Sequence, residues 1–134
     1  MGNVINFQYS LELTDNYNTM KLILPKKIYT TDNDGYLPCY DLWDEHFAIL
    51  CAQQDQFILT AHHWSIIYFL RKYYNEYQIA PNIIILKKRM KKEWRIYRIA
   101  DFESLFLSLF PDKKTKGLSI MIRYAGLNLP TVYI

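Results

Sequence analysis

Residues 59–93 have the sequence LTAHHWSIIYFLRKYYNEYQIAPNIIILKKRMKKE, and this stretch decides the fold because it contains two helix signals. Thr60 can cap a helix over 61–77, whose apolar residues recur at helical spacing: Trp64, Ile67, Leu70 and Tyr74. Gln78 to Ala80 interrupt the pattern, and Pro81 suits the first turn of a second helix through about Lys92. The stretch therefore predicts a helix-turn-helix-like pair with a basic second helix.

Further helices are predicted on both sides of this pair. Asp41 can cap a helix with Asp44 and Glu45 in its first turn, where negative charge suits the positive end of the helix dipole. One face of that helix holds Trp43, Phe47, Leu50 and Cys51. We also expect helices from Asp101 to Phe110-Pro111 and from Gly117 to Tyr124, followed by an extended arm over 125–134.

The first forty residues show the alternation of a half-buried strand instead. Ile5, Phe7, Tyr9, Leu11 and Leu13 alternate with polar residues. A turn is expected over 14–19, a second strand over 20–24 and a third over 27–31. The Asp-Asn-Asp-Gly sequence at 32–35 is a hairpin signal before Tyr36-Leu37. Together these patterns predict a small antiparallel β-meander.

Composition limits the class of protein. The chain has 134 residues, 51% of them hydrophobic, which is enough for one domain with its own core. Two cysteines are too few for a zinc site of cysteines alone or for a disulfide-rich scaffold. The start MGNVINFQYS does not resemble a signal peptide, and no apolar run has the length of a membrane span. We therefore expect a cytoplasmic protein.

The net charge of +3 conceals two oppositely charged segments. Between Ile28 and Leu70 there are six acids and no Lys or Arg: Asp32, Asp34, Asp41, Asp44, Glu45 and Asp55. Between Lys87 and Arg98, seven bases accompany Glu93: Lys87, Lys88, Arg89, Lys91, Lys92, Arg95 and Arg98. The simplest interpretation of the basic run is a solvated helix face. The functional alternative is a docking patch for a phosphate backbone or for an acidic protein.

Candidate chemical groups are few. His62 and His63 are adjacent and point about 100° apart on a helix, and His46 lies on another predicted helix, so we expect no metal site. Cys51 falls on the apolar stripe of its helix and is expected in the core. Cys39 follows Pro38 in a loop and is the better candidate for an exposed thiol. No phosphate-binding glycine loop is present, and no cofactor is implied.

The order of motifs resembles the DsrC/TusE family of sulfur-relay proteins from about residue 22 onward, with residues 1–21 as an extension. Residues 31–37, TDNDGYL, resemble the family's T-D-x-x-G-Y-L, and Trp43 matches the tryptophan at its first helix. Residues 59–64, LTAHHW, resemble L-[ST]-x-x-H-W. Residues 109–111, LFP, and the arm AGLNLPTVYI at 125–134 resemble L-F-P and A-G-L-x-x-P-x-x-C-[IV].

The resemblance implies a single α+β domain over 1–134, a β-meander packed on helices with a mobile C-terminal arm. The family's arm cysteine carries persulfide sulfur toward tRNA 2-thiolation or serves dissimilatory sulfite reductase. Its position here is Tyr133, and a phenol cannot hold a persulfide. The second arm position falls near Ile122. The resemblance places partner binding at Tyr133, Ile134, Pro130, Gly126, His63 and Trp64, and the basic run adds Lys87, Lys88, Arg89, Lys91 and Lys92.

Three functions stay open at this point. The first is a non-catalytic binding or regulatory partner of TusBCD-like or DsrEFH-like sulfur-transfer proteins, or of sulfite reductase. The second is an active sulfur carrier that uses Cys39 in place of the arm. The third is nucleic-acid binding through the helix-turn-helix-like pair, whose phosphate contacts would depend steeply on salt.

Overall fold

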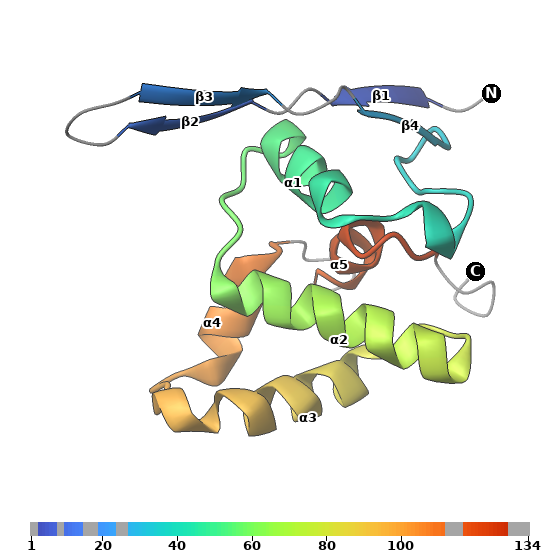
Figure 1. Cartoon of the computed structure of the whole chain (residues 1–134). Coiled ribbons are helices and arrows are strands. Elements are labelled where there is room, and N and C mark those ends of the chain that lie inside the picture. The colour runs from blue at the N-terminus through green and yellow to red at the C-terminus, as the bar shows by residue number, and fades with distance from the viewer. Residues whose placement is uncertain (1–2, 8–9, 15–18, 24–26, 112–116, 129–134) are drawn as a thin grey trace.

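The structure, a computed structural model, describes residues 3–7, 10–14, 19–23, 27–111 and 117–128 (Figure 1). It is mostly helical, with five α-helices in these residues: α1 (Glu45–Gln54), α2 (Ala61–Tyr77), α3 (Ile83–Glu93), α4 (Phe102–Leu109) and α5 (Leu118–Tyr124). Two short 3-10 helices join them: η1 (Tyr40–Leu42) and η2 (Trp94–Tyr97). None of the described helices is long and apolar enough to cross a membrane.

The strands pair in a nested order. β1 (Asn3–Phe7) lies antiparallel to β4 (Lys27–Thr31), and β2 (Ser10–Thr14) lies antiparallel to β3 (Thr19–Ile23). The predicted hairpin around the turn at 14–19 is confirmed by β2 and β3, but the third predicted strand pairs with β1 instead of β3, and residues 36–37 form no strand. Residues 36–37 follow a local turn at Asp32, whose carboxylate accepts the backbone N–H groups of Asp34 and Tyr36, both at 2.9 Å. This local turn directs the chain away from β4.

Two helix starts differ from the predicted ones. Tyr40–Leu42 form η1, so α1 begins only after Asp44, whose carboxylate accepts the Phe47 N–H at 3.1 Å. The predicted cap at Asp41 is wrong by three residues. Similarly, Pro81 lies before α3 rather than in its first turn, because Asn82 is the cap and accepts the Ile85 N–H at 2.9 Å. In both cases the side chain that completes the N-terminal hydrogen bond decides the start.

The remaining helix predictions are confirmed. α2 covers 61–77 and ends at Gln78, which adopts a left-handed conformation. α4 is capped by Asp101, whose carboxylate accepts the Ser104 N–H at 3.1 Å. α5 follows Gly117, which has φ +84°. The spacing of caps and apolar residues was sufficient for these three elements because their signals are local.

The core lies between the helices. Its fully buried large side chains come from every helix: Phe47, Ile66, Ile67, Leu70, Leu86, Met90, Phe106, Met121, Ile122 and Tyr124. β4 joins this core through Tyr29, whose ring packs against Phe47 with centroids 5.3 Å apart. The Tyr29 hydroxyl donates to Asp44 at 2.5 Å, and burial beside that carboxylate raises its pKa.

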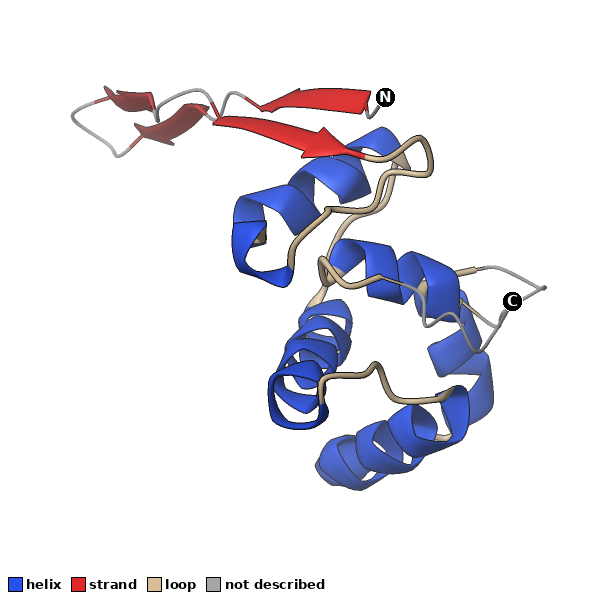
Figure 2. Cartoon of the chain, turned by 90° about the vertical axis from the view of Figure 1, so that its right-hand side faces the viewer, coloured by secondary structure: helices blue, strands red, loops and turns tan. Residues whose placement is uncertain are grey.

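The helices are arranged so that the two charged segments lie apart. Both views place β4 and α1 at one end of the molecule, α2 and α5 in the middle and α3 at the other end (Figures 1 and 2). The acids of residues 32–55 belong to the first end, and the bases of residues 87–98 belong to the second. The net charge thus separates into an acidic pole and a basic pole.

Candidate functional site

The base of the predicted arm, which we call the arm root (Ala125–Leu127), is buried. Ala125 and Leu127 are 0% and 2% exposed. Gly126 has φ +72°, and a Cβ there would lie 2.5 Å from Cδ1 of the Trp43 ring. The Leu127 N–H donates to the Ile122 carbonyl at 3.0 Å, which closes the end of α5. Gly126 therefore anchors the arm root inside the fold and is not on a surface where a partner could bind, as the resemblance had implied.

Two side chains from distant segments hold the arm root. The Trp43 Nε1–H donates to the Tyr124 carbonyl at 2.7 Å. Arg71, on α2, donates to the Ala125 carbonyl at 2.8 Å and to the Tyr40 carbonyl at 3.1 Å. Its guanidinium carbon also lies 4.1 Å from the centre of the Trp43 ring and 3.9 Å from that of Tyr40. One guanidinium thus joins the η1 loop, α2 and the arm root.

Burial sets the electrostatics of Arg71. Desolvation lowers the pKa of its guanidinium, and interactions with Tyr40, Glu45 and Asp41 partly offset that effect. Arginine stays charged because its ordinary pKa is above 12. The direct contacts of the guanidinium are with carbonyl oxygens and aromatic faces, so dipoles and ring quadrupoles stabilise the positive charge together with the more distant carboxylates.

A pocket of about 280 Å³, which we call the arm-exit pocket, lies beside Asn128, the last described residue of the arm. It is lined by Asn128, the first exposed residue after the arm root, and by Thr30, Thr31, Asp32, Tyr36, Leu37 and Pro38. Cys39 follows Pro38 directly and is exposed. The exposed thiol predicted from the sequence is confirmed, and it lies next in sequence to a residue of the arm-exit pocket.

Cys51 is in the core, as predicted. It is 1% exposed, and burial, with a smaller contribution from Asp55, raises the pKa of its thiol to about 12. A thiol with such a pKa holds its proton at neutral pH and is a poor nucleophile. Cys51 is therefore not a candidate nucleophile, and Cys39 is the exposed cysteine of the two.

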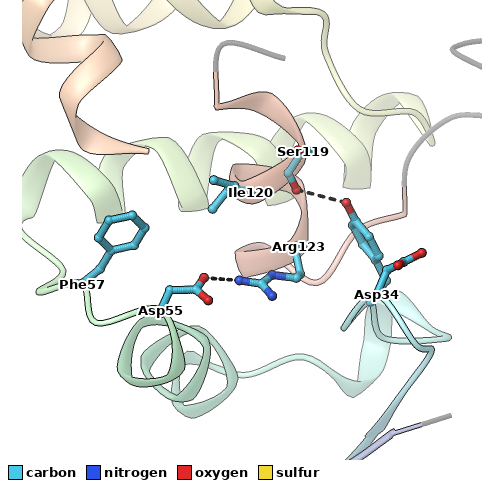
Figure 3. A pocket seen from close by; sticks show the side chains of 7 residues that line it. Asp34, Asp55, Phe57, Ser119, Ile120 and Arg123 are labelled. Carbon is cyan, nitrogen blue, oxygen red and sulfur yellow. Dashed lines mark hydrogen bonds and ion pairs between the residues drawn. The ribbon is translucent and has the colours of Figure 1, made fainter. Parts of the chain in front are cut away.

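A larger pocket, of about 480 Å³, lies between the turn at residues 32–36, the end of α1 and α5 (Figure 3). Four of its residues are engaged with one another: Arg123 pairs with Asp55, and the Tyr36 hydroxyl donates to the Ser119 carbonyl at 3.3 Å. The Tyr124 hydroxyl donates to Asp55 at 2.7 Å, and burial beside that carboxylate raises its pKa. These contacts indicate a structural network rather than a reactive centre.

His63 lies inside the fold and not on a docking surface. Its ring is 6% exposed, and Nδ1 accepts the Thr60 N–H at 3.0 Å in a capping box. Nε2 lies 2.7 Å from the Leu109 carbonyl, so this nitrogen holds the proton and donates. The neutral ring therefore joins the start of α2 to the end of α4, and a partner cannot reach it without unfolding that corner.

We expect acid to destabilise the fold through His63. Desolvation lowers the pKa of its ring below the ordinary 6.5, so the unfolded chain binds a proton that the folded chain rejects. A proton on Nδ1 would also repel the Thr60 N–H that it now accepts. The unfolding free energy, measured with urea, should therefore fall as pH drops from about 7 toward about 5.

The control is His63→Gln, because glutamine at this position keeps the capping box. The variant should be less stable than the native chain at neutral pH, and it should lose part of the pH slope. His46 and His62 are unchanged in both chains, so the difference between the two slopes isolates His63. Equal slopes would contradict the assignment.

The basic residues divide into paired and unpaired groups. Lys87 pairs with Glu103 and Arg89 pairs with Glu93, each at 2.8 Å. Within the basic run 87–98, five exposed cations make no ion pair with another described residue: Lys88, Lys91, Lys92, Arg95 and Arg98. Lys87 and Arg89, predicted to bind a partner, are thus engaged by the fold, and Arg95 and Arg98 are free.

Trp64, also predicted at the docking surface, is half-buried and stacks on Tyr68 with ring centroids 5.6 Å apart. The remaining arm residues of that prediction, Pro130, Tyr133 and Ile134, lie outside the described residues. In the part that is described, no three His, Cys, Asp or Glu side chains gather as metal ligands would. Tyr40 and Arg71 were not found from the sequence, because their contacts join segments far apart in the chain.

Together, the fold and the arm root define a class of small, mostly helical domains in which the residues after the last described helix are anchored in the core. A family model described as "DsrC like protein" matches residues 24–134. Among solved structures, the NMR structure of Allochromatium vinosum DsrC is similar, with a TM-score of 0.64 and 32% identity over 92% of this chain and 97% of that one. The chain therefore belongs to the DsrC/TusE family of sulfur-relay proteins.

Other relatives agree with this assignment. The oxidized gamma-subunit of the dissimilatory sulfite reductase (DsrC) from Archaeoglobus fulgidus has a TM-score of 0.59 and 32% identity, covering 90% of this chain and 97% of that one. Sulfurtransferase TusE of Buchnera aphidicola is 31% identical over 79% of this chain and 91% of its own. The TusE homolog of Haemophilus influenzae is 43% identical over 47% of this chain, and that match spans 58% of the relative's length.

Proposed function

We propose that this chain is a docking or regulatory member of the sulfur relay that does not hold persulfide on its arm. One observation supports the proposal: in the arm motif that begins at Ala125, the position of the family's cysteine is Tyr133. A phenol oxygen cannot accept and release sulfane sulfur as a thiolate does. The partners we propose are TusBCD-like or DsrEFH-like sulfur-transfer proteins, or sulfite reductase.

The anchored arm root fits a docking role. Trp43 and Arg71 hold the carbonyls of Tyr124 and Ala125, so the point at which the arm begins is fixed in the domain. The loss of the thiol at Tyr133 leaves this support intact. A partner that recognises the family's arm could therefore be occupied by this chain without receiving sulfur from it.

Tyr133→Cys provides the test of this proposal. The new thiolate should attack the terminal sulfur of a loaded TusBCD-like or DsrEFH-like donor, form a Cys–S–S group and release the donor's cysteine thiolate. Mass spectrometry should find one added sulfur on the variant and none on the native arm, while pull-down should recover the donor with both. No pull-down by either chain, or sulfur on neither, would overturn the proposal.

A second candidate function is sulfur transfer through Cys39. The observation that favours it is the position of this exposed thiol, next in sequence to the arm-exit pocket. The same experiment in Cys39→Ser distinguishes the two functions. Sulfur that appears on the native chain and disappears in Cys39→Ser would establish a displaced carrier and replace the docking proposal.

A further inference from the structure

The basic pole contains a small pocket that the proposed relay function does not use. It has a volume of about 190 Å³ and lies where α3, η2 and the start of α4 meet. Three cationic and three apolar side chains line it: Lys91, Arg95, Arg98, Trp94, Ile99 and Phe102. The volume is below the roughly 300 Å³ of typical small-molecule sites, so it suits one apolar side chain better than a whole metabolite.

Most of the positive charges around the pocket are not paired with described acidic residues. Lys88, Lys91, Lys92, Arg95 and Arg98 are exposed and form no ion pair in the described part of the chain. The neighbouring Lys87 and Arg89 are paired with glutamates. Two positive charges of α3 are therefore neutralised, and those next to the pocket keep their full attraction for a partner. A cluster of one sign raises the local concentration of oppositely charged partners.

An unpaired hydrogen-bond donor lies at the same place. Trp94 is 3% exposed, and its Nε1–H is a buried side-chain donor without a partner among the described residues. The Trp43 indole, by contrast, donates to a carbonyl at 2.7 Å. Buried donors are nearly always satisfied, because an unpaired one loses its hydration without compensation. A small movement of the ring toward an incoming acceptor would remove that loss.

Exposed apolar side chains favour a protein over a nucleic acid at this surface. Ile96 is 76% exposed and Tyr97 is 60% exposed, and both belong to η2, which also contributes Trp94 and Arg95. Trp, Tyr and Arg are the residues most enriched at the centre of protein interfaces. A phosphate backbone would contact the cations but would leave Ile96 in water.

We propose that this surface, which we call the η2 site (Lys91, Trp94, Arg95, Arg98, Ile99 and Phe102), binds an acidic peptide segment of a partner protein. One apolar side chain of the segment enters the pocket, and flanking carboxylates contact Lys91, Arg95 and Arg98. A backbone carbonyl of the segment accepts the Trp94 indole N–H. The proposal does not depend on whether the arm holds sulfur, because the η2 site shares no residue with the arm root or the arm-exit pocket.

The test uses the full chain and a fluorescent peptide with one leucine flanked on each side by four glutamates. Anisotropy should show saturable binding, and the paired change Lys91→Glu with Arg95→Glu should weaken it about tenfold. Arg98→Gly should weaken it too while keeping the fold, because Arg98 has φ +51° and glycine accepts that conformation readily. In NMR, the Trp94 indole N–H signal, assigned with Trp94→Phe, should shift on binding.

Matched controls separate this site from general charge attraction. Lys72→Glu makes the same charge change as either single substitution, Lys91→Glu or Arg95→Glu, but on α2, ten residues and about 15 Å along the helix from His62, whose ring contacts Trp94. It should leave the affinity within about twofold. Binding of an all-glutamate peptide with equal affinity, or tighter binding of duplex DNA, would refute the proposal. So would a change of oligomeric state in the Lys91, Arg95 variant, since the occupant would then be a second copy.

Discussion

Gly126→Ala is expected to destabilise the fold by about 2–5 kcal/mol. An L-residue in the left-handed region costs roughly 1–2 kcal/mol, and Gly126 has φ +72°. The added methyl would also lie 2.5 to 2.8 Å from three atoms of Trp43, and overpacking of this kind costs about 1–3 kcal/mol. Trp43 cannot easily move, because its indole donates to the Tyr124 carbonyl and faces Arg71.

Gly35→Ala is the matched control for this change. Gly35 also has a positive φ, of +90°, but its Cβ would meet the side chain of Arg123, which is long and flexible. The control therefore measures mainly the backbone cost, about 1–2 kcal/mol. Urea unfolding of both variants gives the difference. If Gly126→Ala were no worse than Gly35→Ala, the close contact between the arm root and Trp43 would be wrong.

Helix positions could be predicted from the sequence wherever the deciding groups are close in the chain. Thr60, Asp101 and Gly117 lie beside the helices that they delimit, and those helices are where the caps predicted them. Asp41 and Asp44 are equally good caps by residue type. The choice between them depends on η1, which places Trp43 against the arm root, and no local spacing reveals that contact.

The candidate site was harder to predict for the same reason. Trp43 and Tyr124 are 81 positions apart, and Arg71 is 54 positions from Ala125. The sequence shows that Arg71 lies on a helix rich in aromatic residues. It does not show which backbone carbonyls will accept hydrogen bonds from the guanidinium. His63 shows the opposite error, since a polar residue near a helix start was assigned to the surface and is buried by two specific hydrogen bonds.

The separation of the acidic and basic segments, in contrast, could be predicted from the sequence. The acidic and basic segments are each continuous in the chain and fold into opposite ends of the molecule (Figures 1 and 2). What the sequence could not show is which cations the fold neutralises. Lys87 and Arg89 pair with glutamates, whereas Arg95 and Arg98, which line a pocket, form no ion pair with any residue that the structure describes. The candidate partner surface therefore moves from the middle of α3 toward η2.

Arg71→Met is expected to cost about 2–4 kcal/mol and to release the arm root. Methionine keeps much of the apolar volume but leaves the carbonyls of Ala125 and Tyr40 without their donor. Each hydrogen bond from a charged group contributes about 1.5–3 kcal/mol, and removal of the buried charge returns part of that loss. Hydrogen exchange should therefore become faster at the Gly126 and Leu127 N–H groups, beyond the change in global stability.

Two variants test whether the geometry or the charge of Arg71 matters. Arg71→Lys keeps the charge but lacks the planar fork that reaches two carbonyls and stacks on Tyr40 and Trp43. It should recover less than half of the lost stability. Lys72→Met, at the adjacent exposed position, should change stability by less than about 0.5 kcal/mol. Full recovery by lysine would mean that a point charge suffices, and the arm root would then be held by electrostatics rather than by the shape of the guanidinium.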